Sequence, residues 1–179
     1  LRIGIPVSRV TTIRDSKETI LNALADSNSR TEVILVSGGL GPTPDDITKQ
    51  CINAFFKTRL VPNAQVKEDV EALLKRRGLH RLSSNRDQAL SPEAAEVIRN
   101  PIGTAPGLIL RKNGSIFIFM PGVPPALEKM IRGPIVHFLK QELSIEPLYT
   151  HLLRPTGISE ARLYELIKDI VDEEEKIGL

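Results

Sequence analysis

A short apolar strand followed by a glycine-rich turn and a helix constrains the fold of this chain more than any other feature. Residues 33–36 read Val-Ile-Leu-Val, and residues 37–48 continue as Ser-Gly-Gly-Leu-Gly-Pro-Thr-Pro-Asp-Asp-Ile-Thr. Consecutive apolar, mostly β-branched residues are typical of a strand covered on both faces. The glycines let the backbone adopt positive φ and approach a ligand closely, and the helix behind them presents N–H groups to an anion. The pattern predicts a site for a phosphorylated ligand at the carboxyl end of this strand.

The acidic residues of this loop need a separate explanation, because carboxylates repel a phosphate. Asp45 and Asp46 make sense as ligands of a divalent cation that bridges to the phosphate, or as a helix N-cap plus one catalytic carboxylate. One cap accounts for one aspartate only, so we predict metal binding or catalysis for at least one of them. The loop residues predicted to bind the ligand are Gly38, Gly39, Gly41, Thr43 and Thr48. The open alternative is a tight strand-to-helix turn that binds nothing.

Strands alternate with helices over most of the chain, which predicts a layered α/β fold with a mainly parallel sheet. A strand is expected at 7–13, and Asp15 with Glu18 can form a capping box for the helix that follows; a catalytic role for Asp15 is equally open. The remaining expected elements are strands at 33–36, 108–111 and 116–120, and helices at 47–57, from Asn63 to Arg77 and from Pro124 to Glu142. Polar loops at Asp15, 38–46 and 121–124 should meet at one edge of the sheet.

The second half of the chain adds a hairpin, a polar loop and a second unit. Lys112-Asn113-Gly114 is a strong hairpin signal between two strands. Residues 79–106 are expected to be irregular and functional. Asn85 and Gln88 in this loop suit amide contacts to a base or ribose, while Thr104 and Gly107 should line the same cleft and Pro121-Gly122 should shape its wall. From Pro147, a strand at 149–154 and a helix from Glu160 indicate a second unit.

Composition excludes several classes of protein. The chain has 179 residues, of which 41% are hydrophobic and 26% charged, with a net charge of +2, so it shows no bias toward nucleic acid. Its single cysteine, Cys51, rules out an internal disulfide and a cysteine zinc cluster, and we interpret it as a small buried residue. No apolar run approaches the length of a membrane span, so no membrane partner and a cytoplasmic location are expected. Residues 1–6 resemble a helix end, which leads us to expect sequence upstream of Leu1.

Four motifs in this order closely resemble the competence-damage-inducible (CinA) family, whose amino-terminal domain has the molybdopterin-binding or molybdenum-cofactor-biosynthesis (MoCF) fold. The motifs are the glycine block at 38–48, Asn85-Arg-Asp-Gln-Ala, Asn100-Pro-Ile-Gly-Thr-Ala-Pro-Gly and Pro121-Gly-Val-Pro. The resemblance covers residues 1–141 and implies a three-layer α/β/α domain over 1–143 that lacks its first strand and helix. Residues 147–179 resemble, more weakly, the beginning of a small α+β linking domain.

The resemblance also implies a function. For the CinA branch it implies metal-dependent hydrolysis of a nucleotide pyrophosphate bond, as in ADP-ribose, with Asp46 and Asp15 at the positions of catalytic aspartates. Asp45 and Asp46 would bind a divalent, magnesium-like ion, with a monovalent cation as a further candidate. For the cofactor-synthesis branch it implies molybdopterin binding or adenylation, and the MoCF-like domain of FAD synthases is a related alternative. The partner would be a nucleotide or pterin phosphate, and a homodimer or homotrimer is expected.

One departure from the family pattern bears on activity. Pro125-Ala126-Leu127 replaces the usual Ser-Glu-Met, so the expected acid at position 126 is absent, and whether Glu128 substitutes for it stays open. A non-catalytic nucleotide-binding module is therefore a third hypothesis.

Overall fold

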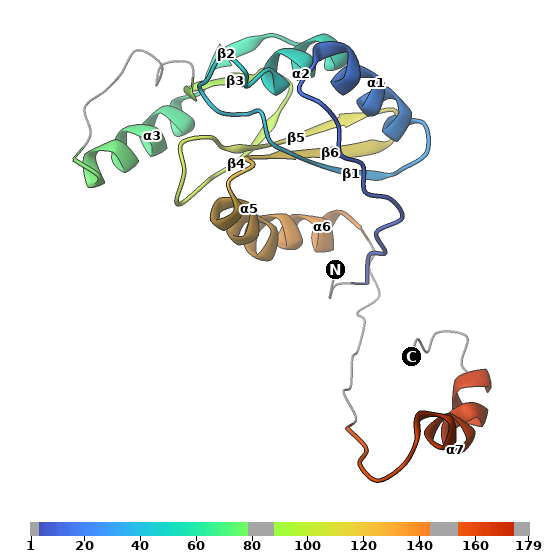
Figure 1. Ribbon diagram of the computed structural model, residues 1–179. Helices are drawn as coiled ribbons and strands as arrows, with labels where there is room; N and C mark the ends of the chain where they lie inside the picture. Colours follow the sequence, from blue (N-terminus) through green and yellow to red (C-terminus); the bar gives the residue numbers. More distant parts are fainter. Residues whose placement is uncertain (1–3, 79–87, 144–153, 174–179) are drawn as a thin grey trace. The chain divides into compact units, whose positions relative to one another are not determined.

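The computed structural model describes residues 4–78, 88–143 and 154–173, and it divides the chain into two compact units, Leu1–Glu146 and Pro147–Leu179. The first unit contains a four-stranded sheet in the order β1-β6-β5-β4 and a separate pair, β2 and β3 (Figure 1). The strands are β1 Val33–Ser37, β2 Leu60–Pro62, β3 Leu90–Pro92, β4 Glu96–Ile98, β5 Gly107–Lys112 and β6 Ser115–Met120. The helices of this unit are α1 Lys17–Asn28, α2 Thr48–Phe56, α3 Ala64–Arg76, α5 Pro124–Met130, the π-helix η1 Ile131–Ile135 and α6 Val136–Glu142.

Helices cover both faces of the sheet. Successive residues of β6 point to opposite faces, so they pack against different helices. Phe117 and Phe119 belong to a core with α1 and α2, whereas Ile118 and Met120 belong to a core with α5, η1 and α6. All residues of β6 are buried, as expected for a strand covered on both faces. Figure 1 shows α1 and α2 on one side of the sheet and α5 and α6 on the other. The predicted α/β class with three layers is confirmed.

The described strands form the mainly parallel sheet with one antiparallel excursion that the sequence predicts. β1 pairs parallel with β6, but β6 pairs antiparallel with β5, and β5 pairs antiparallel with β4. The strands β1, β6 and β4 therefore run in the same direction, and β5 runs opposite to them. Asn113 and Gly114 have φ of 50° and 84°, which suits the two-residue turn that joins β5 to β6. The hairpin prediction is thus confirmed, and β5 is the one strand of the described sheet that runs against the others.

Residues 7–13 do not form the strand that their β-branched sequence predicts. This segment contains no assigned element, and Val7 and Val10 are 60% and 83% exposed. Backbone N–H and C=O groups need a neighbouring strand to form a ladder, and β1 has β6 as its partner among the described strands. β-propensity alone therefore does not make this segment a strand.

The helix starts show which caps were predicted correctly. Ser16, not Asp15, is the N-cap of α1, because the Ser16 hydroxyl accepts a hydrogen bond from the Thr19 amide at 3.3 Å. The predicted capping box of Asp15 is therefore wrong by one residue. Asn63 caps α3 as expected, with Oδ1 accepting from the Val66 amide at 3.0 Å.

Two further expectations are corrected or refined. Residues 79–106 were expected to be irregular, but β3 and β4 lie within the described part of this range, where short hydrogen-bonded stretches satisfy the backbone. The helix predicted from Pro124 to Glu142 is present as α5, η1 and α6. Its π-helical turn contains Pro134, which lacks an N–H and so loosens the hydrogen-bond pattern there.

The second unit is described over 154–173 only. It contains α7 Glu160–Glu173, and the Ser159 hydroxyl accepts from the Arg162 amide at 3.3 Å at its start. The strand expected at 149–154 lies largely outside the described residues. In the parts of both units that are described, no helix is long and apolar enough to cross a membrane.

Candidate functional site

Two loops meet at the carboxyl ends of β1 and β6. The Gly38 amide donates to the Met120 carbonyl at 3.0 Å, which extends the β1–β6 ladder by one bond. A Cβ on Gly122 would lie 3.3 Å from the Gly38 Cα, so the two backbones are in contact. The predicted convergence of the glycine loop with the Pro121–Gly122 turn is therefore observed. Carboxyl ends of parallel neighbours are where α/β sheets commonly bind ligands.

The glycine loop folds back onto the start of α2. Gly38 and Gly39 have φ of +106° and +65°, a region that glycine adopts without penalty. The Thr48 amide donates to the Gly39 carbonyl at 3.1 Å. Thr48 is buried, with 4% of its surface exposed, so it faces this loop and not solvent. The sequence thus produces a closed connection between β1 and α2.

Asp46 organises the second half of this loop. Its Oδ2 accepts from the Thr43 amide at 3.0 Å and also from the Thr43 hydroxyl. A Cβ on Gly41 would lie 2.5 Å from the same oxygen, so only glycine leaves room for the carboxylate. The N-cap position of α2 is Ile47, without a side-chain cap, so the N-cap alternative for Asp46 is wrong.

Asp45 lies beside Asp46 but is exposed. A hydrogen bond from Thr43 lowers the pKa of the Asp45 carboxyl below its ordinary value, and the backbone amide of Asp45 adds to this effect. Thr43 therefore interacts with both aspartates and keeps the more exposed one ionised. Two carboxylates on one short turn give this loop a concentrated negative charge.

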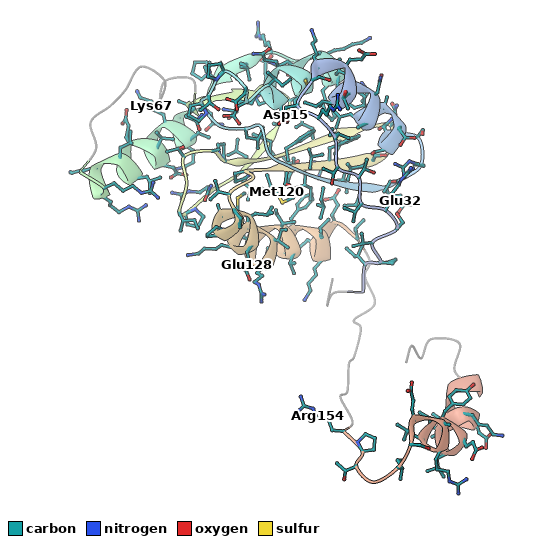
Figure 2. All side chains as sticks on the ribbon, viewed as in Figure 1. Asp15, Glu32, Lys67, Met120, Glu128 and Arg154 are labelled. Carbon is teal, nitrogen blue, oxygen red and sulfur yellow. The ribbon has the colours of Figure 1, made fainter. Side chains whose placement is uncertain are left out.

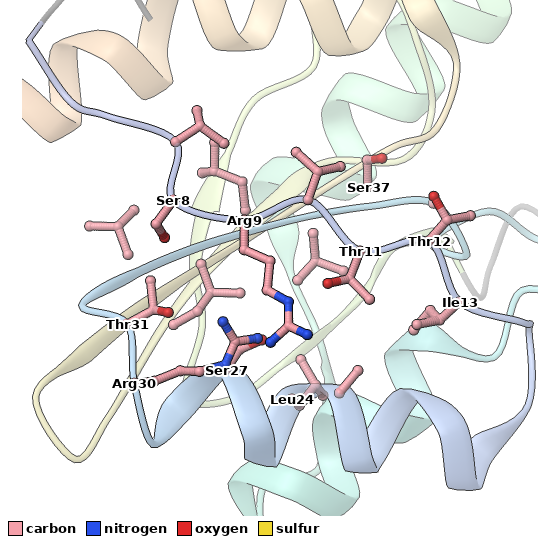
Figure 3. A pocket seen from close by; sticks show the side chains of 18 of the residues that line it. Ser8, Arg9, Thr11, Thr12, Ile13, Leu24, Ser27, Arg30, Thr31 and Ser37 are labelled. Atoms are coloured by element: carbon pink, nitrogen blue, oxygen red, sulfur yellow. The ribbon is translucent and has the colours of Figure 1, made fainter.

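A cavity of about 570 Å³ opens next to this loop, between residues 5–13, β1 and α1 (Figure 3). Gly38, Thr48 and Asp15 all line it. Asp15 precedes α1, on the side of the sheet that α2 also covers (Figure 2). Because Ser16 provides the cap of α1, the helix start does not explain Asp15. The cavity thus brings together three of the predicted site residues, while Asp45 and Asp46 are not part of its lining.

Gln88 is fully buried, and neither its Nε2 nor its Oε1 has a hydrogen-bond partner in the described structure. It lies two residues before Leu90, whose carbonyl accepts from Lys49 Nζ in the first turn of α2 at 3.2 Å. A buried amide without partners is rare in folded proteins, so Gln88 is unusual among the residues that the structure describes. Asn85, the other predicted amide contact, lies outside the described residues.

Asn100, which was not among the predicted site residues, organises the loop before β5. Asn100 is 8% exposed, and its Nδ2 donates to the Ala105 carbonyl at 2.8 Å. Its Oδ1 accepts from the amides of Ile102 and Gly103. Thr104 lies half-buried within this loop. The Asn-Pro sequence was a turn signal that could have identified Asn100 as the organiser.

Gly107 begins β5 and is buried in the core under α5. A Cβ there would lie 2.5 Å from Met130 Cε and 3.3 Å from the Phe119 carbonyl oxygen. Close packing alone accounts for this glycine. Ala126 in α5 is also buried, with 3% of its surface exposed. Glu128 lies on the outer side of α5 and pairs with Arg132 at 2.9 Å (Figure 2), so it does not replace the missing acid.

The chemistry of the donor set limits how a metal could bind. No three His, Cys, Asp or Glu side chains come together as a metal site anywhere in the described residues. Mg²⁺ is commonly held by one or two protein carboxylates together with substrate phosphates and water. The Asp45–Asp46 pair fits that mode, in which the ligand itself supplies part of the coordination.

Comparison with known proteins places this fold and loop in a family. Residues 1–141 match the family described as "Probable molybdopterin binding domain". A CinA-like protein of Nostoc punctiforme is 40% identical over 168 residues, which cover 93% of this chain and 40% of that protein. A putative competence-damage inducible protein of Caldicellulosiruptor bescii is 35% identical over 169 residues, covering 94% and 41%.

A solved structure agrees with these matches. The crystal structure of a CinA protein of unknown function from Thermoplasma acidophilum superposes with a TM-score of 0.58 at 28% identity, covering 72% of each chain. The chain spans about two fifths of the length of the curated relatives named above. The chain belongs to the molybdopterin-binding (MoCF) domain family, and the similarity to CinA-like proteins that its motifs predicted is confirmed.

Proposed function

We propose that this chain binds a nucleotide diphosphate and hydrolyses its pyrophosphate bond with the help of a divalent metal, ADP-ribose being the first substrate to test. The single observation that carries the proposal is the loop between β1 and α2. It combines two positive-φ glycines with the Thr43–Asp46 turn, at the sheet edge where the Pro121–Gly122 turn also lies. Such a loop offers amides to a phosphate and carboxylates to a cation side by side.

The residues of this loop would have distinct roles. The backbone amides of Gly39, Leu40 and Gly41 and the Thr48 hydroxyl would bind the diphosphate, and Asp45 with Asp46 would hold the metal. A bound metal ion neutralises phosphate charge and lowers the pKa of a coordinated water. Asp15 is the candidate to accept a proton from the attacking water, since it lines the same cavity as Gly38 and Thr48. The Gln88 amide, which has no partner among the described residues, is a candidate contact to the base or ribose.

The experiment is hydrolysis of ADP-ribose by the purified protein with and without MgCl₂, with AMP and ribose phosphate measured by chromatography. We expect Asp46→Asn and Asp15→Asn each to lower turnover by about 10²-fold or more. Asp169→Asn, on α7 in the second unit, is the matched control because it removes the same charge elsewhere. Turnover that is unchanged in a folded Asp46→Asn protein would refute the role of that carboxylate.

A second candidate is binding or adenylation of molybdopterin, and the description of the matching family favours it. In this second function the same backbone amides would bind the phosphate of the pterin, and ATP would be the co-substrate. Titration with molybdopterin and with ADP-ribose, followed by calorimetry, separates the two. Tight pterin binding with ATP consumption and no ADP-ribose hydrolysis selects the second candidate, whereas binding of a nucleotide without turnover selects a non-catalytic module.

The location and the oligomeric state of the protein are also proposals. We place the protein in the cytoplasm and expect a homodimer or homotrimer. Light scattering after gel filtration measures the oligomer directly, and a monomer at all concentrations would contradict it.

A further inference from the structure

β2 and β3 stand apart from the main sheet, so side chains decide where their residues lie relative to the glycine loop. Among the described strands these two form a separate pair. β3 packs against α2, and Figure 1 shows the pair beside that helix. Beyond the end of α2, the Ala94 amide donates to the Thr58 hydroxyl at 3.3 Å, and Arg59 pairs with Glu93 at 2.9 Å. These exposed contacts hold the far end of β3.

A buried lysine holds the near end of β3 against the first turn of α2. Lys49 keeps 7% of its surface exposed, and its Nζ donates to the Leu90 carbonyl at 3.2 Å. Burying an ammonium group costs free energy, and a long side chain loses rotamer freedom when it is held in place. In return, a buried lysine that bonds a backbone carbonyl of another element fixes the two elements against each other. Lys49 thus fixes the beginning of β3 against α2.

Gln88 lies two residues before this bond and is fully buried. Its Nε2 and Oε1 have no partner among the described residues, and the same holds for the Ser91 hydroxyl on the other side of Leu90. A carboxamide presents a donor and an acceptor side by side, which complements the edge of a nucleobase or the hydroxyls of a ribose. A phosphate group offers acceptors only and would leave the amide oxygen unpaired. The Gln88 side chain therefore suits the nucleoside part of a nucleotide better than its diphosphate.

The first turn of α2 connects this amide to the glycine loop. The Thr48 amide donates to the Gly39 carbonyl at 3.1 Å, and the next residue, Lys49, bonds β3. Two adjacent residues of one helix thus contact the loop assigned to the diphosphate and the strand that follows Gln88. A change in the bond from Lys49 to Leu90 would move Gln88 relative to that loop.

We propose that Lys49 is a positioning residue, which holds Gln88 beside the glycine loop so that the Gln88 amide binds the nucleoside part of the ligand. This inference rests on the proposed function, because it takes the glycine loop as the diphosphate site. Lys49 acts through the Leu90 carbonyl and not on the ligand itself. The nucleoside then adds affinity through Gln88 only while the bond from Lys49 to Leu90 is intact.

The test compares two probes that share a diphosphate group and resist hydrolysis, methylenediphosphonate and adenosine 5′-(α,β-methylene)diphosphate. Calorimetry of the full chain with MgCl₂ measures both affinities. Gln88→Leu, which keeps a similar volume without polar atoms, should weaken binding of the adenosine probe by about five- to tenfold and leave methylenediphosphonate within about twofold. Lys49→Met should give the same split. Lys49→Arg, which keeps a donor, should recover most of the lost affinity.

Lys112→Met is the matched control. Lys112 donates to the Phe55 carbonyl in the last turn of α2, so this variant removes a bond of the same kind at the end remote from the glycine loop. We expect it to lower the melting temperature and to leave both affinities unchanged. If Lys49→Met does not fold, Lys49→Gln takes its place, because its shorter side chain stays polar but loses the reach to Leu90.

A double variant separates positioning from stability. Because Lys49 acts through Gln88, adding Lys49→Met to Gln88→Leu should cause no further loss of affinity for the adenosine probe. Additive losses, or equal losses for both probes, would assign Lys49 to stability alone and overturn the proposal. Equal binding of both probes by the wild type would remove Gln88 as a nucleoside contact.

Hydrolysis of ADP-ribose is measured on the same proteins. The expected split between the probes without hydrolysis retains the positioning role of Lys49 and rejects the hydrolase alone. Hydrolysis with no split between the probes does the reverse. Failure of the wild type to bind either probe rejects both the diphosphate site and the role of Lys49.

Discussion

Gly39 and Thr48 are locked together: the Thr48 amide donates to the Gly39 carbonyl at 3.1 Å, and a Cβ on Gly39 would overlap Thr48 Oγ1 and lie 3.0 Å from Thr48 Cβ. This contact fixes where α2 begins relative to the end of β1. The candidate ligand loop is therefore held at both ends, and its geometry depends on the absence of one methyl group.

Gly39→Ala should destabilise the protein by about 2–4 kcal/mol. The substitution strains a residue at a φ of +65° and forces the new Cβ against a buried side chain. Chemical denaturation measures the loss. Gly133→Ala is the control, because a Cβ there meets nothing within 4 Å. Equal stability of the two variants would show that the loop adjusts without cost.

Asn100→Ala should cost about 1–3 kcal/mol, since it leaves the Ala105 carbonyl and two loop amides without their partner. Asn22→Ala, at an exposed position of α1, should be neutral or slightly stabilising because alanine favours a helix. Both free energies come from urea titrations. A loss at Asn22 as large as that at Asn100 would contradict the assigned role.

Thr43→Val should raise the pKa of Asp45 toward its ordinary value of 3.8, because the hydrogen bond that lowers it is removed. A lowered pKa means that the carboxylate stabilises the folded state above pH 3.8 and that this contribution is lost as the pH falls through the lowered pKa. The stability difference between wild type and variant should therefore shrink on acidification. NMR titration of the Asp45 carboxyl tests this directly. Thr58→Val, which loses a hydrogen bond from the Ala94 amide instead, should leave that titration unchanged.

Cys51 should react with thiol reagents only when the protein unfolds. The residue has no exposed surface, and burial raises the pKa of its thiol above the ordinary 9.0, with Lys17 opposing weakly. At pH 8, the rate of reaction with a disulfide reagent should rise with urea in step with unfolding. Immediate stoichiometric reaction in native buffer would show that α2 opens locally.

Local sequence signals predicted most of the elements. These signals involve residues that are close in the sequence, so they could be interpreted without knowing the fold. They are the spacing of hydrophobic residues, the Asn63 cap and the Asn113–Gly114 turn. The cap of α1 was displaced by one residue because Asp15 and Ser16 are both good cap formers, and only the hydrogen bond to Thr19 distinguishes them.

Features that depend on distant parts of the chain were harder to predict. Whether 7–13 becomes a strand depends on a neighbour and not on its own residues. The loop from Gly38 to Asp46 was located from its sequence, but the bond from Thr43 to Asp46 and the contact between Gly38 and Gly122 arise only in the folded molecule. The packing role of Gly107 likewise depends on Met130, more than twenty residues away.

β6 has a consequence for how the first unit can open. Phe117 and Phe119 anchor one helical layer, and Ile118 and Met120 anchor the other, through a single backbone. Detaching either layer exposes side chains of the same strand, so the two layers should melt in one cooperative step. The β6 amides should then be among the last to exchange with solvent, and the free energy of their opening should equal that of global denaturation.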